Sequence, residues 1–125
     1  MLPLAIRGCS MSNTALIDLE HLDRYVSGDV ALRDEILSIF EEQADMWTRM
    51  LDPNAEDAIW KDAAHALKGA SRGVGAWDVG DICAEAEKLI GHERRDAVRR
   101  SVVLEELRQK VRETVAEVRR LRQLG

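Results

Sequence analysis

The residues around position 65 have the types and spacing needed to carry an anionic group. His65 lies in a segment with the composition of a helix, and an α-helix turns about 100° per residue. Lys61, Lys68, Gly69 and Arg72 therefore lie within about 60° of His65 around the helix axis. An imidazole beside cations, with a bare glycine one turn away, can hold an anion and be reached by another protein.

The apolar residues of the same segment lie on the other side of the predicted helix. They fall roughly 100–220° from His65 and comprise Ile59, Trp60, Ala63, Ala66, Leu67, Ala70 and Val74. His65 is therefore predicted to face solvent. Gly69 costs about 1 kcal/mol relative to alanine inside a helix, and we interpret it as clearance around His65.

Two other interpretations of His65 are a surface histidine without a role and a metal ligand. A metal site is not expected, because no second histidine or cysteine follows at i+3 or i+4 and the neighbouring cations repel metal ions. Lys68 is the candidate partner for the anion. Lys61 and Arg72 are possible electrostatic support at less specific positions.

The spacing His65-x-x-Lys68-Gly69, followed by Gly75-Ala76, resembles the pattern of histidine-containing phosphotransfer (HPt) domains of bacterial two-component phosphorelays. Residues 81–89 also resemble the helix that follows in that family. The motif covers about a quarter of the chain, and the helical pattern covers most of the rest.

The resemblance implies a role for each matching residue. His65 would be the phosphoacceptor, Lys68 would stabilise the phosphate, and Gly69 would give it steric clearance. Glu87 lies where some members of the family place a glutamine that can bond the phosphate. A carboxylate there would repel phosphate unless Lys68 intervenes, so we expect no direct role for Glu87. We also expect Lys68 to be exposed and to contribute little to stability.

The function implied is that of a histidine phosphotransfer intermediate. It would accept a phosphoryl group from the aspartyl phosphate of a receiver domain and pass it to another receiver, in a hybrid histidine kinase or a response regulator. The Mg²⁺ for the transfer would belong to the receiver, so no cofactor is expected in this chain. Because a glycine-rich nucleotide loop and an acidic metal pair near His65 are lacking, we expect a phosphocarrier without its own kinase or ATPase activity.

Two alternatives belong to other classes of protein. One is a non-catalytic helical adaptor or inhibitor that docks a receiver domain without phosphotransfer, against which the intact His65, Lys68 and Gly69 argue. The other is a coiled-coil scaffold built on the last helix. A monomer would count against the scaffold, and a monomer is what we expect.

Composition limits the class of protein. The 125 residues fit one domain, are 46% hydrophobic and 33% charged, and have a net charge of −5. Residues 91–125 carry 10 basic and 6 acidic side chains, but the interleaved glutamates indicate a solvated helix face rather than nucleic-acid binding. Only Cys9 and Cys83 are present, with no run of transmembrane length, so we expect a cytoplasmic protein that binds no membrane.

The chain divides into an N-terminal tail, residues 1–17, expected to be flexible, and a single HPt-like domain, residues 18–125. Whether translation begins at Met11 is left open by the sequence. Helices are predicted over 19–26, from the cap at Asp29 to about 52, over 55–72, over 77–90, and from Asp96 onward. Short loops between them predict an all-α fold: an antiparallel up-down four-helix bundle with a short additional N-terminal helix.

The apolar positions predict which helix faces are buried. Residues 30–52 carry one helical stripe that includes Leu32, Ile39, Phe40 and Ala44. The last helix carries a seam with 3-4 spacing formed by Leu104, Leu107, Val111, Thr114, Val118 and Leu121. Asn54 is the expected N-cap of the His65 helix. Cys83 is expected to be buried, and His21 and His92 are expected to be ordinary surface residues.

Overall fold

The computed structural model describes residues 15–91 and 96–124, in which all regular structure is α-helical. The helices are α1 (Leu19–Val26), α2 (Val30–Met50), α3 (Asp57–Gly73), α4 (Trp77–Glu87) and α5 (Ala97–Leu124). The predicted fold class is confirmed: four helices form the bundle, and a short additional helix precedes them.

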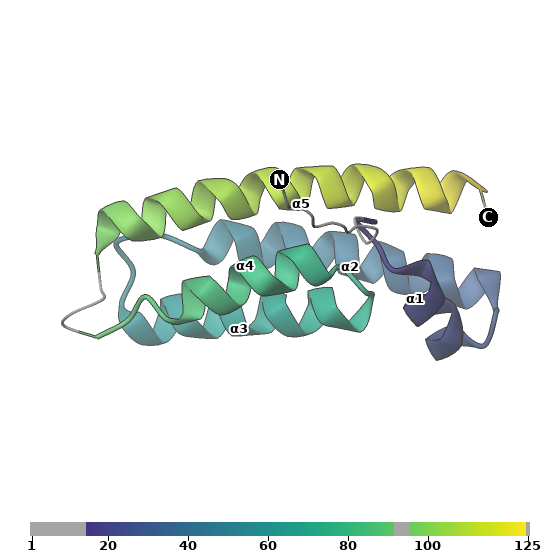
Figure 1. Cartoon of the computed structure of the whole chain (residues 1–125), viewed down its shortest axis with the longest axis horizontal. Coiled ribbons are helices and arrows are strands. Elements are labelled where there is room, and N and C mark those ends of the chain that lie inside the picture. The colour runs from purple at the N-terminus through teal and green to yellow at the C-terminus, as the bar shows by residue number, and fades with distance from the viewer. Residues whose placement is uncertain (1–14, 92–95, 125) are drawn as a thin grey trace, which may run out of the picture.

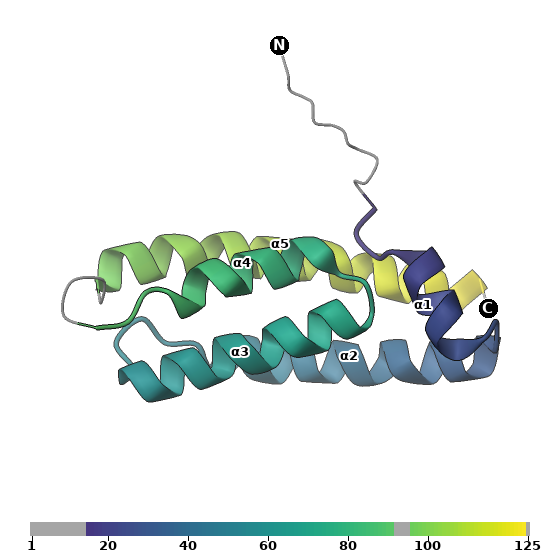
Figure 2. The same ribbon diagram turned by 60° about the horizontal axis from the view of Figure 1, so that its bottom comes forward.

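The four long helices run alternately up and down, so that each is antiparallel to the next along the chain (Figures 1 and 2). α2 and α5 extend past α3 and α4 at one end of the bundle, and α1 lies at that end (Figure 2). α3 packs against both α2 and α4. These two neighbours shape the surroundings of its exposed face.

The core lies between the inner faces of all five helices. Its fully buried large side chains include Leu22, Leu37, Phe40, Trp60, Leu67, Val79, Leu107 and Val118. Every member of the predicted α5 seam is buried, from Leu104 to Leu121. Burial of one such side chain contributes about 1.5–3 kcal/mol, so this seam is a large part of what holds α5 on the bundle.

The apolar residues of α2 form two rows rather than one. Phe40 and Ala44 are buried as predicted, but Leu32 and Ile39 are exposed on the outer surface. The single stripe predicted from the sequence was wrong here, because residues seven apart can repeat along either side of a helix. Ile59 of α3 is likewise about half exposed, at the edge of the face where it was expected to be buried.

Several predicted boundaries differ from the structure. The N-cap of α3 is Glu56 rather than Asn54, and it makes no side-chain capping bond. α4 ends at Glu87, three residues before the predicted end. Ile17, which was assigned to the flexible tail, is buried in the core. The remaining predictions for the tail, Cys9 and Met11 included, and for His92 concern residues outside the described part.

Asp18 fastens α1 to the turn between α3 and α4. Its carboxylate caps α1 by accepting from the backbone N–H of His21 at 3.1 Å, and it accepts from the Trp77 indole at 2.9 Å. Its own backbone N–H donates to the Gly75 carbonyl at 2.9 Å. The bonds from Trp77 and His21 hold the pKa of the Asp18 carboxyl below its ordinary value. The His21 ring packs edge-on against Trp77, so His21 is not the ordinary surface residue that was expected.

Arg100 is fully buried at the opposite end of the bundle, where α3 begins and α4 ends. Its guanidinium donates to the carbonyls of Leu89, Pro53 and Ala55 and to the carboxylate of Asp57. It also lies over the Trp60 ring, with its central carbon 4.7 Å from the ring centroid. These contacts join the loops before α3 and after α4 to the first turn of α5.

We predict that Gly75→Ala lowers the free energy of unfolding by at least about 2 kcal/mol. Gly75 has a φ of +80°, and an added Cβ would lie 2.9 Å from both the Cβ and the carbonyl oxygen of Asp18. Gly73→Ala is the control, because its Cβ would meet no atom within 4 Å. That variant should be stabilised by up to about 1 kcal/mol. Urea denaturation of both variants measures the difference, and equal stabilities would contradict this account of the turn.

Candidate functional site

His65, Lys68 and Glu87 meet at the surface between α3 and α4. The imidazole Nδ1 of His65 lies 3.1 Å from Oε2 of Glu87, and the ammonium of Lys68 lies 2.6 Å from Oε1 of the same carboxylate. The His65 side chain is 69% exposed, whereas that of Glu87 is 14% exposed. One partly buried carboxylate therefore holds a histidine that is open to solvent.

The charge on Glu87 decides which nitrogen of His65 is free. Burial by itself raises the pKa of Glu87, but the hydrogen bonds from Lys68 and His65 outweigh it and leave the pKa below the ordinary value. Glu87 is thus a carboxylate at neutral pH and can only accept a hydrogen bond. Nδ1 of a neutral His65 must then carry the proton, and Nε2 presents its lone pair to solvent.

The structure gives Glu87 a contact that was not expected from its sequence. It touches both His65 and Lys68, and Lys68 is the cation that offsets its charge. Only the resemblance to a family pointed to this position. Hydrophobic periodicity could not show it, because the contact depends on how the last turn of α4 lies against α3.

Lys68 is less exposed than its position on α3 suggested. Its side chain is 22% exposed and lies against Glu87. The expectation that Lys68 contributes little to stability is therefore not supported, because its removal would leave Glu87, a mostly buried carboxylate, without its closest cation.

The two other cations lie differently around His65. Arg72 crosses α4 at Gly80, where an added Cβ would come 2.9 Å from its Cγ, and its guanidinium is 3.8 Å from a carboxylate oxygen of Asp81. Arg72 therefore lies against the first half of α4, whereas His65 and Lys68 contact Glu87 at the end of that helix. Lys61 is exposed one turn before His65 on α3.

Gly69 opens onto a shallow apolar groove between α2 and α3. A Cβ added at Gly69 would meet no atom within 4 Å, so the glycine is not required for helix packing. The groove has a volume of about 260 Å³ and is lined by Tyr25, Ile36, Ile39, Phe40, Gln43, Gly69, Ala70, Gly73 and Val74. The outer apolar residues of α2 thus line a groove that extends to Gly69, one turn from His65 on α3.

Cys83 of α4 is fully buried, as predicted. Burial, together with the nearby charge of Glu87, raises the pKa of its thiol to about 12. The thiol is therefore protonated at neutral pH and packs as a small apolar side chain.

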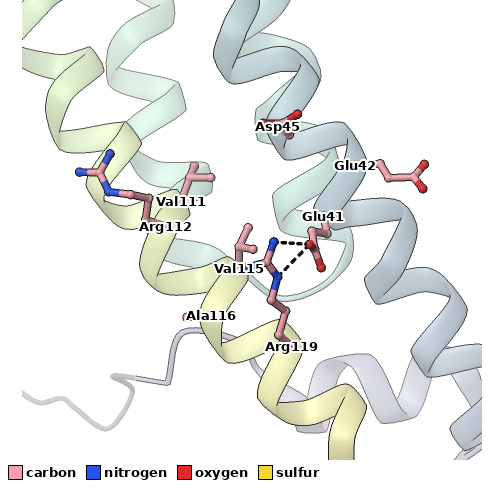
Figure 3. Close-up of a pocket in the computed structure, with 8 residues that line it drawn as sticks. All are labelled: Glu41, Glu42, Asp45, Val111, Arg112, Val115, Ala116 and Arg119. Carbon is pink, nitrogen blue, oxygen red and sulfur yellow. Dashed lines mark hydrogen bonds and ion pairs between the residues drawn. The ribbon is translucent and has the colours of Figure 1, made fainter.

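A larger groove, of about 620 Å³, lies between α2 and α5 (Figure 3). Its walls carry Glu41, Glu42 and Asp45 on α2 and Arg112 and Arg119 on α5. The Arg119 guanidinium reaches across it to Glu41 at 2.8 Å. None of its lining residues belongs to α3 or α4, so this groove shares nothing with the His65 surface.

The described helices include none that is both long enough and apolar enough to cross a membrane. Within the same residues, no group of three or more histidine, cysteine, aspartate or glutamate side chains is arranged to hold a metal ion.

Comparison with known proteins gives a family match and a structural match. The family model described as Hpt domain matches residues 18–121. The chain is also similar to the crystal structure of the histidine phosphotransferase ShpA from Caulobacter crescentus, at 33% sequence identity and a TM-score of 0.66. That match covers 89% of this chain and 100% of the other. A search of curated proteins gives no match.

We predict that Lys68→Met lowers the free energy of unfolding by about 1–2 kcal/mol at pH 7. Because Lys68 helps to hold the pKa of Glu87 below its ordinary 4.5, this stabilisation is complete above that value. It is lost as the pH falls through the lowered pKa and Glu87 becomes protonated. Denaturant melts of wild type and variant at pH 7 and at the lowest pH at which both still fold should therefore differ less at the lower pH.

Lys88→Met is the matched control for this prediction. Lys88 pairs with Glu85 three residues away, and both side chains are more than half exposed. Its loss should cost less than about 0.5 kcal/mol at either pH. A Lys68→Met variant no less stable than this control would show that Glu87 does not need its ammonium.

Proposed function

The chain belongs to the Hpt domain family, and from this and the site geometry we propose that His65 accepts a phosphoryl group from the aspartyl phosphate of a receiver domain and passes it to another receiver. Histidine phosphotransfer in a phosphorelay is the general function of this family. Hpt domains generally interact with the receiver domains of phosphorelay proteins.

One observation carries the assignment to His65. Its ring is largely exposed, and its Nδ1 is engaged by Glu87, so Nε2 is the nitrogen available to an incoming phosphorus atom. In the proposed step Nε2 attacks in line: the Nε2–P bond forms as the bond from phosphorus to the aspartyl oxygen breaks. The ring then carries a positive charge, and its Nδ1–H faces the Glu87 carboxylate. The same steps in reverse deliver the group to the next receiver.

Lys68 would donate hydrogen bonds to the oxygens of the phosphoryl group during the transfer. Its ammonium has three N–H donors and lies against Oε1 of Glu87, which leaves donors for phosphate. Its charge also offsets that of Glu87, which would otherwise repel an anion next to His65. Arg72 and Lys61 would contribute only to the general positive potential, since Arg72 pairs with Asp81.

A receiver would dock over the α2–α3 face. This face presents exposed Tyr25 and Ile39 beside Gly69, and apolar surface of this kind is typical of protein contacts. We propose that the Mg²⁺ for the transfer belongs to the receiver and that this chain needs no cofactor. We further propose that it acts as a cytoplasmic monomer, without kinase or ATPase activity of its own.

We predict that His65→Gln folds normally and takes no phosphate from a phosphorylated receiver. Glutamine can still bond Glu87 but offers no nucleophilic nitrogen. The measurement is transfer of radiolabelled phosphate from a panel of phosphorylated receivers, with the label tested for acid lability and base stability. His21→Gln should label like wild type. Phosphohistidine formation in the His65→Gln variant would exclude His65 as the sole acceptor.

Gly69 distinguishes a carrier from the alternative, an adaptor that docks a receiver without phosphotransfer. We predict that Gly69→Ala and Gly69→Leu fold, because a Cβ at Gly69 would meet no atom within 4 Å and the position opens onto the groove between α2 and α3. The single-turnover transfer rate should fall from Gly to Ala to Leu, with Leu slower by at least about tenfold, because the leucine occupies the approach to His65. Ala116→Leu, on the exposed surface of α5, is the control and should transfer at the wild-type rate. A wild-type rate for Gly69→Leu would contradict the clearance role.

A further inference from the structure

Glu87 can serve His65 only if the end of α4 is held still. It is the last residue of α4, and the last turn of a helix is the part that frays, because its carbonyls lack partners within the helix. A shift of about 1 Å in that turn would break a hydrogen bond of 3.1 Å. The structure therefore needs a contact that fixes this turn against α3.

Trp60 makes that contact. Its indole N–H donates to the carbonyl of Ala86, the residue before Glu87, at 2.7 Å, and the side chain is fully buried. Trp60 and His65 are five residues apart on α3, which puts them roughly 140° apart around its axis. The two side chains thus contact consecutive residues at the end of α4 from different sides of α3.

Arg100 holds the indole and the chain that follows α4. Its guanidinium lies over the Trp60 ring at 4.7 Å, and its Nε donates to the Leu89 carbonyl at 3.0 Å. Asp57 accepts from Arg100 at 2.8 Å and from the backbone N–H of Gly91 at 2.9 Å. The segment after Glu87 is therefore fixed to α3 and α5 at two further points.

We propose that Trp60, held by Arg100, is a positioning residue for the phosphoacceptor: it sets the contact of Glu87 with His65 and Lys68 and thereby the imidazole tautomer that presents Nε2. This inference rests on the proposed phosphotransfer function. A tryptophan that only filled the core would contribute to stability but would leave the tautomer of His65 unchanged.

The test removes the indole N–H while keeping an aromatic ring under Arg100. In Trp60→Phe, ¹⁵N NMR of the His65 ring at alkaline pH should show a smaller share of the Nδ1–H tautomer than in wild type. Single-turnover transfer from a phosphorylated receiver should slow by about tenfold. Trp47→Phe makes the same change in a tryptophan of α2, and it should alter neither quantity.

A second variant separates the hydrogen bond from the volume of the ring. Replacing Trp60 by β-(3-benzothienyl)alanine keeps the size and shape of the indole and puts sulfur in place of the N–H. It should reproduce the tautomer shift of Trp60→Phe even if the phenylalanine variant is too unstable to study. A wild-type tautomer population in the benzothienyl variant would overturn the proposal and make Trp60 a core residue only.

The NMR measurement needs no partner, so the two proposals fail in different ways. If wild-type protein takes no phosphate from any receiver, the proposed function fails while the tautomer still reports on positioning. If wild type is phosphorylated and the benzothienyl variant matches it in tautomer and rate, positioning by Trp60 fails and the function stands.

Discussion

The arrangement of the bundle depends on the hydrogen bonds of one buried guanidinium, that of Arg100. Removing a charge from water is costly, and Arg100 is fully buried, so its donors must find partners inside the protein. The carbonyls of Pro53, Ala55 and Leu89 and the carboxylate of Asp57 supply them. All four residues are in the loops at one end of the bundle or next to them. The requirement to satisfy Arg100 thus fixes where α3 begins and where the chain leaves α4, and between these points lies the pair of helices that forms the site.

A second constraint follows from the charges at the surface. Glu87 is mostly buried and ionised, which is tolerable because Lys68 and His65 both donate to it. The carboxylate can orient the imidazole and stabilise its positive charge, whereas alone it would repel a phosphate. The lysine makes the arrangement compatible with an anionic group. The three residues therefore act as one unit, and single substitutions within it are not expected to be additive.

The two sides of α3 have different roles, which explains why its residues are apolar on one side and polar on the other. One side packs Trp60 and Leu67 into the core, and the other presents His65 next to the groove at Gly69. α2 is divided in the same way, with Phe40 inside and Ile39 outside. Exposed apolar surface of this kind is typical of sites at which proteins contact one another. The groove between α2 and α5, spanned by the pair of Glu41 and Arg119, is a separate feature of the fold.

The sequence by itself determined the class of fold, the positions of the helices to within a few residues, the α5 seam and the outward direction of His65. These follow from local rules: helical periodicity, caps and the spacing of a short motif. The residue types and spacing around His65 indicated an anion site, with Lys68 as the cation and Gly69 as clearance. The resemblance added the phosphotransfer roles of these residues, and those roles remain predictions. Only the tertiary structure decided that Leu32 and Ile39 lie outside and that Ile17 is buried. It also decided that Arg72 of α3 lies near Asp81 of α4 and that Glu87 contacts both His65 and Lys68. Each of these depends on contacts between helices or segments distant in sequence. The register of α4 against α3 in particular is set by a buried tryptophan and a buried arginine, whose partners no local pattern identifies.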